Sequence, residues 1–230
     1  MWKQYFSRLE KILETVERNE GSKIEEAAQL IFGALQRNRL VYVFGTGHSH
    51  MLAEEMFYRA GGLVSVYPIL ETSLMLHESA ARSSKLERLP GLARVILERY
   101  SLKEGDVMIV ASNSGVNAVP VEVAMRAREL GVRVICITSI AHSTSVEPRN
   151  PAGKRLFEVA DVVIDNHIPI GDGLLDISNT KVSPASTAVG ATILNSIVGQ
   201  VAWLYSKKGE LPPVFSSANT QNGDLENSEL

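Results

Sequence analysis

The sequence has little cysteine, with one such residue in 230. That residue, Cys136, lies inside the apolar run 132–137, so it forms no intrachain disulfide, and we predict a buried, unreactive thiol. The N-terminal residues contain no apolar signal core, and no apolar stretch reaches the ~18 residues that would predict a membrane-spanning helix. We therefore expect a cytoplasmic protein without a membrane partner.

The chain also lacks an excess of positive charge. Its 23 basic and 26 acidic residues give a formal net charge of −3, and the lysines and arginines form no cluster. Nucleic acids and anionic membrane surfaces are bound through basic patches, so we expect neither as a partner. With 45% hydrophobic residues, the chain can instead bury a full core as an ordinary globular protein does.

What the sequence does contain is a regular alternation of short apolar runs and helical patterns. The runs that predict buried strands are 40–44, 63–70, 107–111, 132–138 and 160–165. This spacing is typical of βαβ units and predicts an α/β protein, with a parallel sheet between two layers of helices. Pro68 predicts that the second run is unpaired at its end or lies at an edge.

Helices are predicted before this alternating region. Apolar residues at steps of three and four predict an amphipathic helix over 2–19, which Gly21 ends. A second helix over 22–38 is predicted to start with a capping box formed by Ser22 and Glu25.

The C-terminal part is less regular. Residues 138–153 are predicted to form a loop and residues 166–184 an irregular segment rich in turn residues, followed by a long, buried, apolar helix over 187–205. The expected organisation is N-terminal helices that pack on the core and on a dimer partner, a main domain, and a loosely attached tail, at 1–39, 40–208 and 209–230.

A candidate binding site follows the strand 107–111. The apolar run there gives way to small hydrogen-bonding residues: Ser112, Asn113, Ser114, Gly115 and Asn117. A helix is predicted directly afterwards, with Pro120 in its first turn. Backbone N–H groups and the positive end of a helix dipole then point at one place, which favours an anion such as phosphate. The alternative is a well-capped turn without a ligand, since these are ordinary turn residues.

A second polar turn, Gly-Thr-Gly-His-Ser-His over residues 45–50, follows the strand 40–44. It is not a dinucleotide-binding fingerprint, because His50 stands where the third glycine is required, and it lacks the Gly-Lys-Ser/Thr ending of a Walker loop. Ligands of parallel α/β sheets bind at the carboxyl ends of strands, where both turns are predicted to lie. If the two strands are neighbours, the two turns face one pocket.

Several charged and imidazole groups near these turns have alternative interpretations. His48 and His50 show no spacing that defines a metal site, so no metal is expected, and neutral hydrogen-bonding or acid–base roles are favoured. Glu54 and Glu55 are either surface charges near a helix N-terminus or, for one of them, a general base that points into the pocket. Lys181 either is solvated or neutralises an anionic ligand.

Taken together, Gly45-Thr46-Gly47-His48-Ser49 and Ser112-Asn113-Ser114-Gly115-Val116-Asn117 resemble the SIS (sugar isomerase) domain family, over residues 2–206. The chain resembles most the uncharacterised members named as phosphosugar or phosphoheptose isomerases. The resemblance implies a five-stranded parallel sheet in the flavodoxin-like order. It also implies a homodimer or homotetramer with the site at the subunit interface. The implied ligand is a phosphorylated sugar held by Gly47, His48, Ser49, Ser112, Asn113, Ser114, Gly115, Asn117 and Lys181.

The resemblance also implies a reaction. In phosphoheptose isomerase and the related etherase a glutamate acts ten residues beyond the loop serine, where this chain has Arg59, and Glu55 lies one turn earlier. The isomerase's histidine on the last helix has no counterpart in 187–205. We therefore expect a cofactor-independent isomerase in which Glu55 takes a proton alpha to the carbonyl and His50 moves protons at oxygen. The alternatives are a non-catalytic phosphosugar sensor, favoured by the missing histidine, and an etherase or lyase acting on an amino-sugar phosphate.

Overall fold

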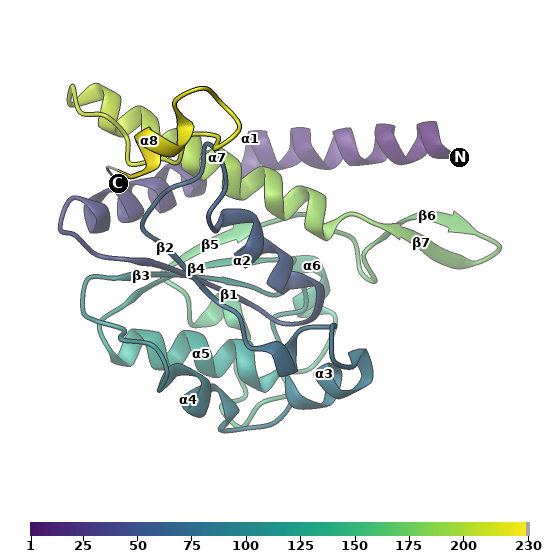
Figure 1. The fold of residues 1–230 in the computed structure, drawn as a ribbon. Helices are drawn as coiled ribbons and strands as arrows, with labels where there is room; N and C mark the ends of the chain where they lie inside the picture. Colours follow the sequence, from purple (N-terminus) through teal and green to yellow (C-terminus); the bar gives the residue numbers. More distant parts are fainter. Residues whose placement is uncertain (229–230) are drawn as a thin grey trace.

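A five-stranded sheet lies at the centre of the computed structural model, which describes residues 1–228 (Figure 1). Its strands are β1 (Val41–Gly45), β2 (Val66–Ile69), β3 (Val107–Ala111), β4 (Arg133–Thr138) and β5 (Val162–Asp165). They pair in the order β2-β1-β3-β4-β5, and each neighbouring pair is parallel. The predicted parallel sheet and its flavodoxin-like order are thus confirmed. β2, with Pro68, forms an edge, as that proline indicates.

Helices cover both faces of the sheet (Figure 1). On one face lie α1 (Trp2–Leu35), α2 (Met51–Met56) and α7 (Ser186–Lys207), and on the other lie α4 (Leu92–Leu97) and α5 (Ala118–Glu129). β3 is apolar throughout because both of its faces are buried. Ile109 packs into one hydrophobic cluster, and Met108 and Val110 pack into the other. A strand that is buried on both sides has no polar face.

The N-terminal region is one helix, so the prediction of two helices was wrong. α1 continues through 34 residues, and both Gly21 and Ser22 lie in its interior, so the predicted capping box does not form. A glycine inside a helix costs only about 1 kcal/mol relative to alanine. The burial of α1 residues such as Ile31 in the core outweighs that cost. The N-terminal half of α1 extends past the sheet (Figure 1).

A hairpin occupies part of the segment 166–184, for which the sequence indicated irregular structure. Its strands, β6 (Gly173–Ile177) and β7 (Thr180–Pro184), pair antiparallel. Ser178 and Asn179 between them both have positive φ angles, 51° and 63°, as a two-residue type I′ turn requires. The pattern was missed because this turn contains no glycine, the residue that most often marks it.

Short helical elements complete the described structure. A helix, α6 (Ile140–Thr144), forms within the predicted loop 138–153. The others are the 3-10 turns η1 (Gly47–His50), η2 (Thr72–Leu74) and η3 (Leu156–Glu158), and the helices α3 (Ala80–Leu86) and α8 (Gly223–Ser228).

The C-terminal segment, expected to be loosely attached, pairs with the body of the protein over part of its length. Backbone hydrogen bonds join Phe215 N–H to the Gly62 carbonyl at 2.9 Å and Val64 N–H to the Pro213 carbonyl at 2.9 Å. The prediction of a loose tail was therefore wrong for this stretch. Residues 229–230 of the tail lie outside the described residues.

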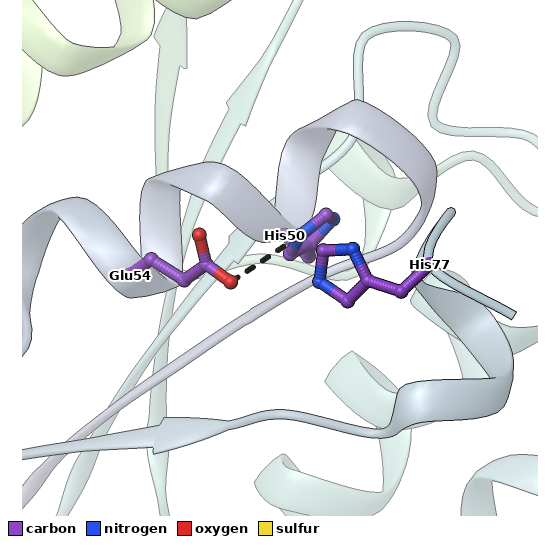
Figure 2. A group of neighbouring side chains, drawn as sticks. All are labelled: His50, Glu54 and His77. Atoms are coloured by element: carbon purple, nitrogen blue, oxygen red, sulfur yellow. Dashed lines mark ion pairs between the residues drawn. The ribbon is translucent and has the colours of Figure 1, made fainter.

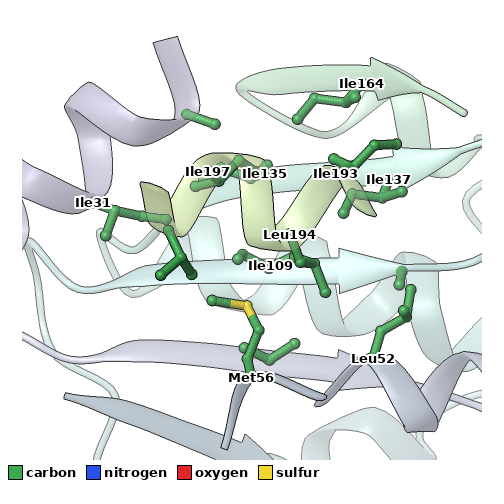
Figure 3. Close-up of a cluster of buried hydrophobic side chains, with 14 of the residues drawn as sticks. Ile31, Leu52, Met56, Ile109, Ile135, Ile137, Ile164, Ile193, Leu194 and Ile197 are labelled. Atoms are coloured by element: carbon green, nitrogen blue, oxygen red, sulfur yellow. The ribbon is translucent and has the colours of Figure 1, made fainter. Parts of the chain in front are cut away.

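α7 is long and apolar enough to cross a membrane by length and composition, contrary to the expectation that no segment is. Its 22 residues include a window with a mean hydropathy of 1.3. One face of α7, with Ile193, Leu194 and Ile197, is buried in the cluster that contains the sheet and α1 (Figure 3), whereas Trp203 is half-exposed. The predicted burial thus holds for one face, and packing in the core accounts for the apolar residues of that face.

Candidate functional site

The two polar turns lie next to each other at the carboxyl ends of neighbouring strands. β1 pairs with β3, and Gly45 at the start of the first turn is opposite Ala111, which precedes the second. The strand order reverses between β1 and β3, which is where ligands of such sheets bind. We call residues 45–50 the first loop and residues 112–117 the second loop. Ser49 of the first loop and Ser112 of the second line one cavity, the loop cavity.

The loop cavity is small and partly polar. Its lining consists of Ser49, Leu52, Ala111, Ser112, Asn113, Ile137, Asn166, Ser186 and Thr187. It encloses about 20 Å³, which is room for roughly one water molecule. A larger ligand would therefore place only one of its groups here.

The first loop turns tightly because of its glycines. A Cβ atom on Gly45 would lie inside the van der Waals radius of the Ser49 carbonyl group, so η1 can fold back on the end of β1 only with glycine at that position. Gly47 has a φ of 55°, in the left-handed region. This turn brings Ser49 to the cavity and leaves His48 exposed.

The second loop is held by hydrogen bonds within itself and to β4. Ser112 Oγ accepts a hydrogen bond from Gly115 N–H at 3.2 Å, and Thr138 Oγ1 donates to the Ser112 carbonyl at 2.7 Å. Gly115 has a φ of 59°, and a Cβ atom there would lie 3.1 Å from Thr138 Oγ1. Within residues 1–228, the backbone N–H groups of Asn113 and Ser114 donate to no protein acceptor. These two N–H groups remain free for a ligand.

Asn166 and Ser186 also belong to the cavity, and neither was selected as a site residue from the sequence. Asn166 is buried, its Nδ2 donates to Asn113 Oδ1 at 2.9 Å, and its Oδ1 accepts from Ile168 N–H at 3.1 Å. Ser186 Oγ donates to Asp172 Oδ2 at 2.6 Å at the start of α7. Asn166 had a signal in the sequence, because it directly follows the predicted strand 160–165 and so lies at the same edge of the sheet. Ser186 had a weaker signal, because it lies in the polar segment directly before the predicted helix 187–205.

Glu87 connects the two loops, although it does not line the cavity. Its Oε2 accepts a hydrogen bond from Thr46 Oγ1 at 2.8 Å and its Oε1 accepts one from Asn117 Nδ2 at 2.9 Å. Burial raises the pKa of Glu87, against the smaller lowering effects of the Thr46 hydrogen bond and of Arg88 and Arg149. The sequence analysis did not select Glu87, because no motif surrounds it.

Two of the predicted binding residues have partners elsewhere. The amide of Asn117 is used by Glu87, and its Oδ1 is buried without a hydrogen-bond partner among the described residues. Lys181 lies on the exposed hairpin and pairs with Asp176 at 2.7 Å. In one chain neither residue is brought together with Ser49 and Ser112.

Glu55, the predicted base, likewise does not line the loop cavity. Its carboxylate pairs with Arg59 and accepts a hydrogen bond from Asn195 Nδ2 at 2.8 Å, which links α2 to α7. α2 ends at Met56, so Arg59 follows the helix and is not one turn further along its face, as the sequence comparison assumed.

His50, the second predicted catalytic residue, is buried beside Glu54 and His77 (Figure 2). Its Nδ1 is hydrogen-bonded to the Gly47 carbonyl. Its ring lies edge-on to His77, with the ring centroids 5.2 Å apart. His50 thus faces a cluster of its own and does not line the loop cavity.

Comparison with known proteins agrees with this geometry. A family model described as the SIS domain matches residues 4–139. The chain belongs to the SIS domain family. A UPF0309 protein of Brucella canis is 47% identical to this SIS domain protein over 209 residues, which cover 90% of this chain and 85% of the relative.

Solved structures with the same fold include enzymes and regulators. The phosphoheptose isomerase GmhA of Neisseria gonorrhoeae has a TM-score of 0.56 at 16% identity, covering 87% of this SIS domain protein and 95% of that chain. The sugar isomerase domain of the RpiR transcription factor of Sphaerobacter thermophilus has a TM-score of 0.53 at 19% identity, covering 90% and 93%. At such identities the likeness shows the fold alone.

Proposed function

We propose that this SIS domain protein binds a phosphorylated sugar, with the phosphate between the first and second loops. The observation that carries the proposal is the cavity shared by Ser49 and Ser112 where the strand order reverses. Hydroxyl groups from both loops, and the free N–H groups of Asn113 and Ser114, are donors of the kind that a phosphate accepts from. The cavity has room for about one water molecule, so one phosphate oxygen would enter it and the rest of the ligand would lie outside.

The reaction we propose is a cofactor-independent isomerisation of the open-chain sugar. Glu55 lies six residues beyond Ser49, about 9 Å further along a helical path, so a sugar anchored by its phosphate would extend along α2 toward this carboxylate. Glu55 would take the proton alpha to the carbonyl, and His50 would move protons at oxygen. Binding of the phosphate would supply the orientation that such proton transfer needs.

A non-catalytic sensor is the second candidate, because α7 lacks the histidine that an isomerase would use. The helix contains no histidine, and Asn195, one of its polar residues, holds Glu55 instead. A carboxylate with two partners in the chain is less free to act as a base. A lyase or etherase reaction on an amino-sugar phosphate would use the same phosphate site.

We also propose that the protein acts as a cytoplasmic homodimer or homotetramer in which a second copy completes the site. Trp2 and Phe6 on α1 are 69% and 66% exposed, an unusual exposure for large apolar side chains. The hairpin lies beside them, where Tyr5 Oη donates to the Pro184 carbonyl at 3.0 Å. In such an assembly the hairpin with Lys181 would reach the partner's loops.

Thermal shift with sugar phosphates tests the shared premise. A ligand that binds only the native state raises the melting temperature. We expect at least one phosphorylated sugar to raise it, and the matching unphosphorylated sugar to have no effect. No shift with any phosphorylated sugar at millimolar concentration would reject both the enzyme and the sensor.

A further inference from the structure

Three side chains from two separate segments of the chain converge beside the first loop (Figure 2). His50 ends η1, Glu54 lies one turn later on α2, and His77 comes from the loop between η2 and α3. One ligand atom from each lies within 4.8 Å of those of the other two. Residues four apart on a helix share a face, so the backbone directs His50 and Glu54 to the same side.

His50 is oriented as a metal ligand would be. The side chain is 3% exposed, and its Nδ1 is hydrogen-bonded to the Gly47 carbonyl. Since a carbonyl oxygen can only accept, we assign the ring proton to Nδ1, which leaves the lone pair on Nε2. Histidines that bind metals typically donate their other N–H to a carbonyl or carboxylate in this way.

The free nitrogen of His50 has no hydrogen-bond partner. Nε2 is buried without one among the described residues, and Glu54 Oε1 lies at 3.4 Å. A buried polar atom left without a partner costs about 1–3 kcal/mol. A bound cation would remove that cost, because it would accept the lone pair of Nε2. The same cation would attract the negatively charged carboxylate of Glu54.

The other two side chains have room to close around an ion. Glu54 and His77 are exposed, whereas His50 is buried and fixed. Around one Zn²⁺ at ligand distances of about 2.0–2.2 Å, neighbouring ligand atoms lie about 3.3 Å apart. Rotation of the two exposed side chains would bring the cluster from its present spacing to that one, and the solvent side would stay open for a water or a substrate oxygen.

We propose that His50, Glu54 and His77 bind one divalent transition-metal ion, of which Zn²⁺ fits best. Two imidazole nitrogens and one carboxylate match the ligand preference of zinc and of similar ions, whereas Mg²⁺ and Ca²⁺ prefer oxygen ligands. The site does not rest on phosphosugar binding, although His50 directly follows Ser49. A metal on Nε2 would exclude His50 as a proton shuttle, so metal binding also decides between these two roles.

The test is metal titration of the full-length protein after treatment with a chelator. We expect calorimetry to show saturable binding of one Zn²⁺ per chain, and Co²⁺ to produce a visible absorption band on binding. Removal of groups that merely support metal ligands costs roughly 10–100-fold in affinity, so loss of a ligand in Glu54→Gln or His77→Ala should cost at least that much. His50→Ala is a poor choice, because the buried ring also supports the fold.

Two neighbouring residues provide matched controls. Glu78, next to His77, pairs with Arg82, and His48 is exposed on the first loop, two residues before His50. Neither residue belongs to the cluster. Glu78→Gln and His48→Ala should bind Zn²⁺ and Co²⁺ as the wild type does. Absence of saturable binding in the wild type would overturn the proposal. Wild-type affinity for Zn²⁺ in Glu54→Gln and His77→Ala would overturn it too, and either result would leave an ordinary imidazole–carboxylate pair. Sugar phosphates are titrated separately into the chelator-treated protein, so failure of one proposal is distinguishable from failure of the other.

Discussion

Asn117 donates a hydrogen bond of 2.9 Å from its side-chain amide to Oε1 of Glu87. The other oxygen of Glu87 accepts from Thr46 at 2.8 Å, so one half-buried carboxylate ties the second loop to the first. The two loops are at least 62 residues apart in the sequence, and β1 pairs with β3 directly before them. Glu87 adds a contact between the loops themselves. The geometry of the loop cavity therefore depends on a residue outside it.

Glu87 should produce a specific pH dependence of stability. Burial raises its pKa above the ordinary value of 4.5, so the folded chain keeps this proton at pH values where the unfolded chain has lost it. Its contribution to the free energy of unfolding is therefore greatest below pH 4.5. The contribution falls as the pH rises from there through the pKa of Glu87 in the folded chain. Glu87→Gln should remove that decline, as measured by urea unfolding across this pH range.

The control for this measurement is Glu98→Gln, since Glu98 is an exposed carboxylate that pairs with Arg94 on the surface of α4. Its pH dependence should match the wild type. In contrast, Glu87→Ala leaves Asn117 and Thr46 without their acceptor and should destabilise the protein by about 1–3 kcal/mol. An unchanged pH profile in Glu87→Gln would show that this carboxylate does not titrate differently in the folded state.

Ser112→Ala should weaken binding of the phosphorylated sugar. A hydrogen bond to a charged group contributes about 1.5–3 kcal/mol, which corresponds to roughly a ten- to hundredfold rise in Kd. Ser49→Ala should act in the same direction. Ser145→Ala is the matched control, because the Ser145 hydroxyl donates to the carbonyl of His142 on the surface. Wild-type affinity in Ser112→Ala, measured by calorimetry, would place the phosphate elsewhere.

Two glycine substitutions should have opposite effects on stability. Alanine at Gly45 would clash with the Ser49 carbonyl, whereas a Cβ atom at Gly21 meets nothing within 4 Å. Gly21→Ala should stabilise the protein by about 0.5–1 kcal/mol, because glycine is unfavourable inside a helix. Gly45→Ala should lower the melting temperature and abolish the sugar-phosphate shift. Destabilisation by Gly21→Ala would contradict the continuous α1.

Glu55→Gln should abolish exchange of the proton alpha to the carbonyl if Glu55 is the base. The measurement is deuterium uptake from solvent into the bound sugar phosphate, and a loss of about 10²–10⁴-fold is typical for removal of a general base. Glu98→Gln serves as the control here as well. Exchange that persists in Glu55→Gln would reject the assignment, and no exchange in the wild type with any bound sugar would favour the sensor.

Replacement of the exposed aromatic residues of α1 should change the oligomeric state. Trp2→Ser with Phe6→Ser removes the large apolar groups from the part of α1 that extends past the sheet. Light scattering after size exclusion should show a smaller assembly than the wild type. The double substitution Phe57→Ser and Tyr58→Ser, also at exposed aromatic positions, is the control. An unchanged mass in the α1 variant would exclude this surface as the interface.

Much of the fold followed from local patterns. The run 107–111 is apolar because β3 is buried on both faces, and the same argument located the other strands of the sheet. The two loops were found because small polar residues directly follow buried strands, and the carboxyl ends of parallel strands meet at one edge. Asn166 could have been found by that rule, since it follows β5.

The sequence by itself thus determined the strands, their parallel arrangement and the two loops, because burial on both faces and turn chemistry act within a few residues. Only the tertiary structure decided that Gly21 lies inside a continuous helix, since packing on α7 and the sheet outweighs the local preference of one glycine. It also decided that His77 meets His50 and that Glu87 meets Thr46 and Asn117. Those contacts come from the segment between β2 and α4, whose course is set by packing against the rest of the chain and by no pattern of its own.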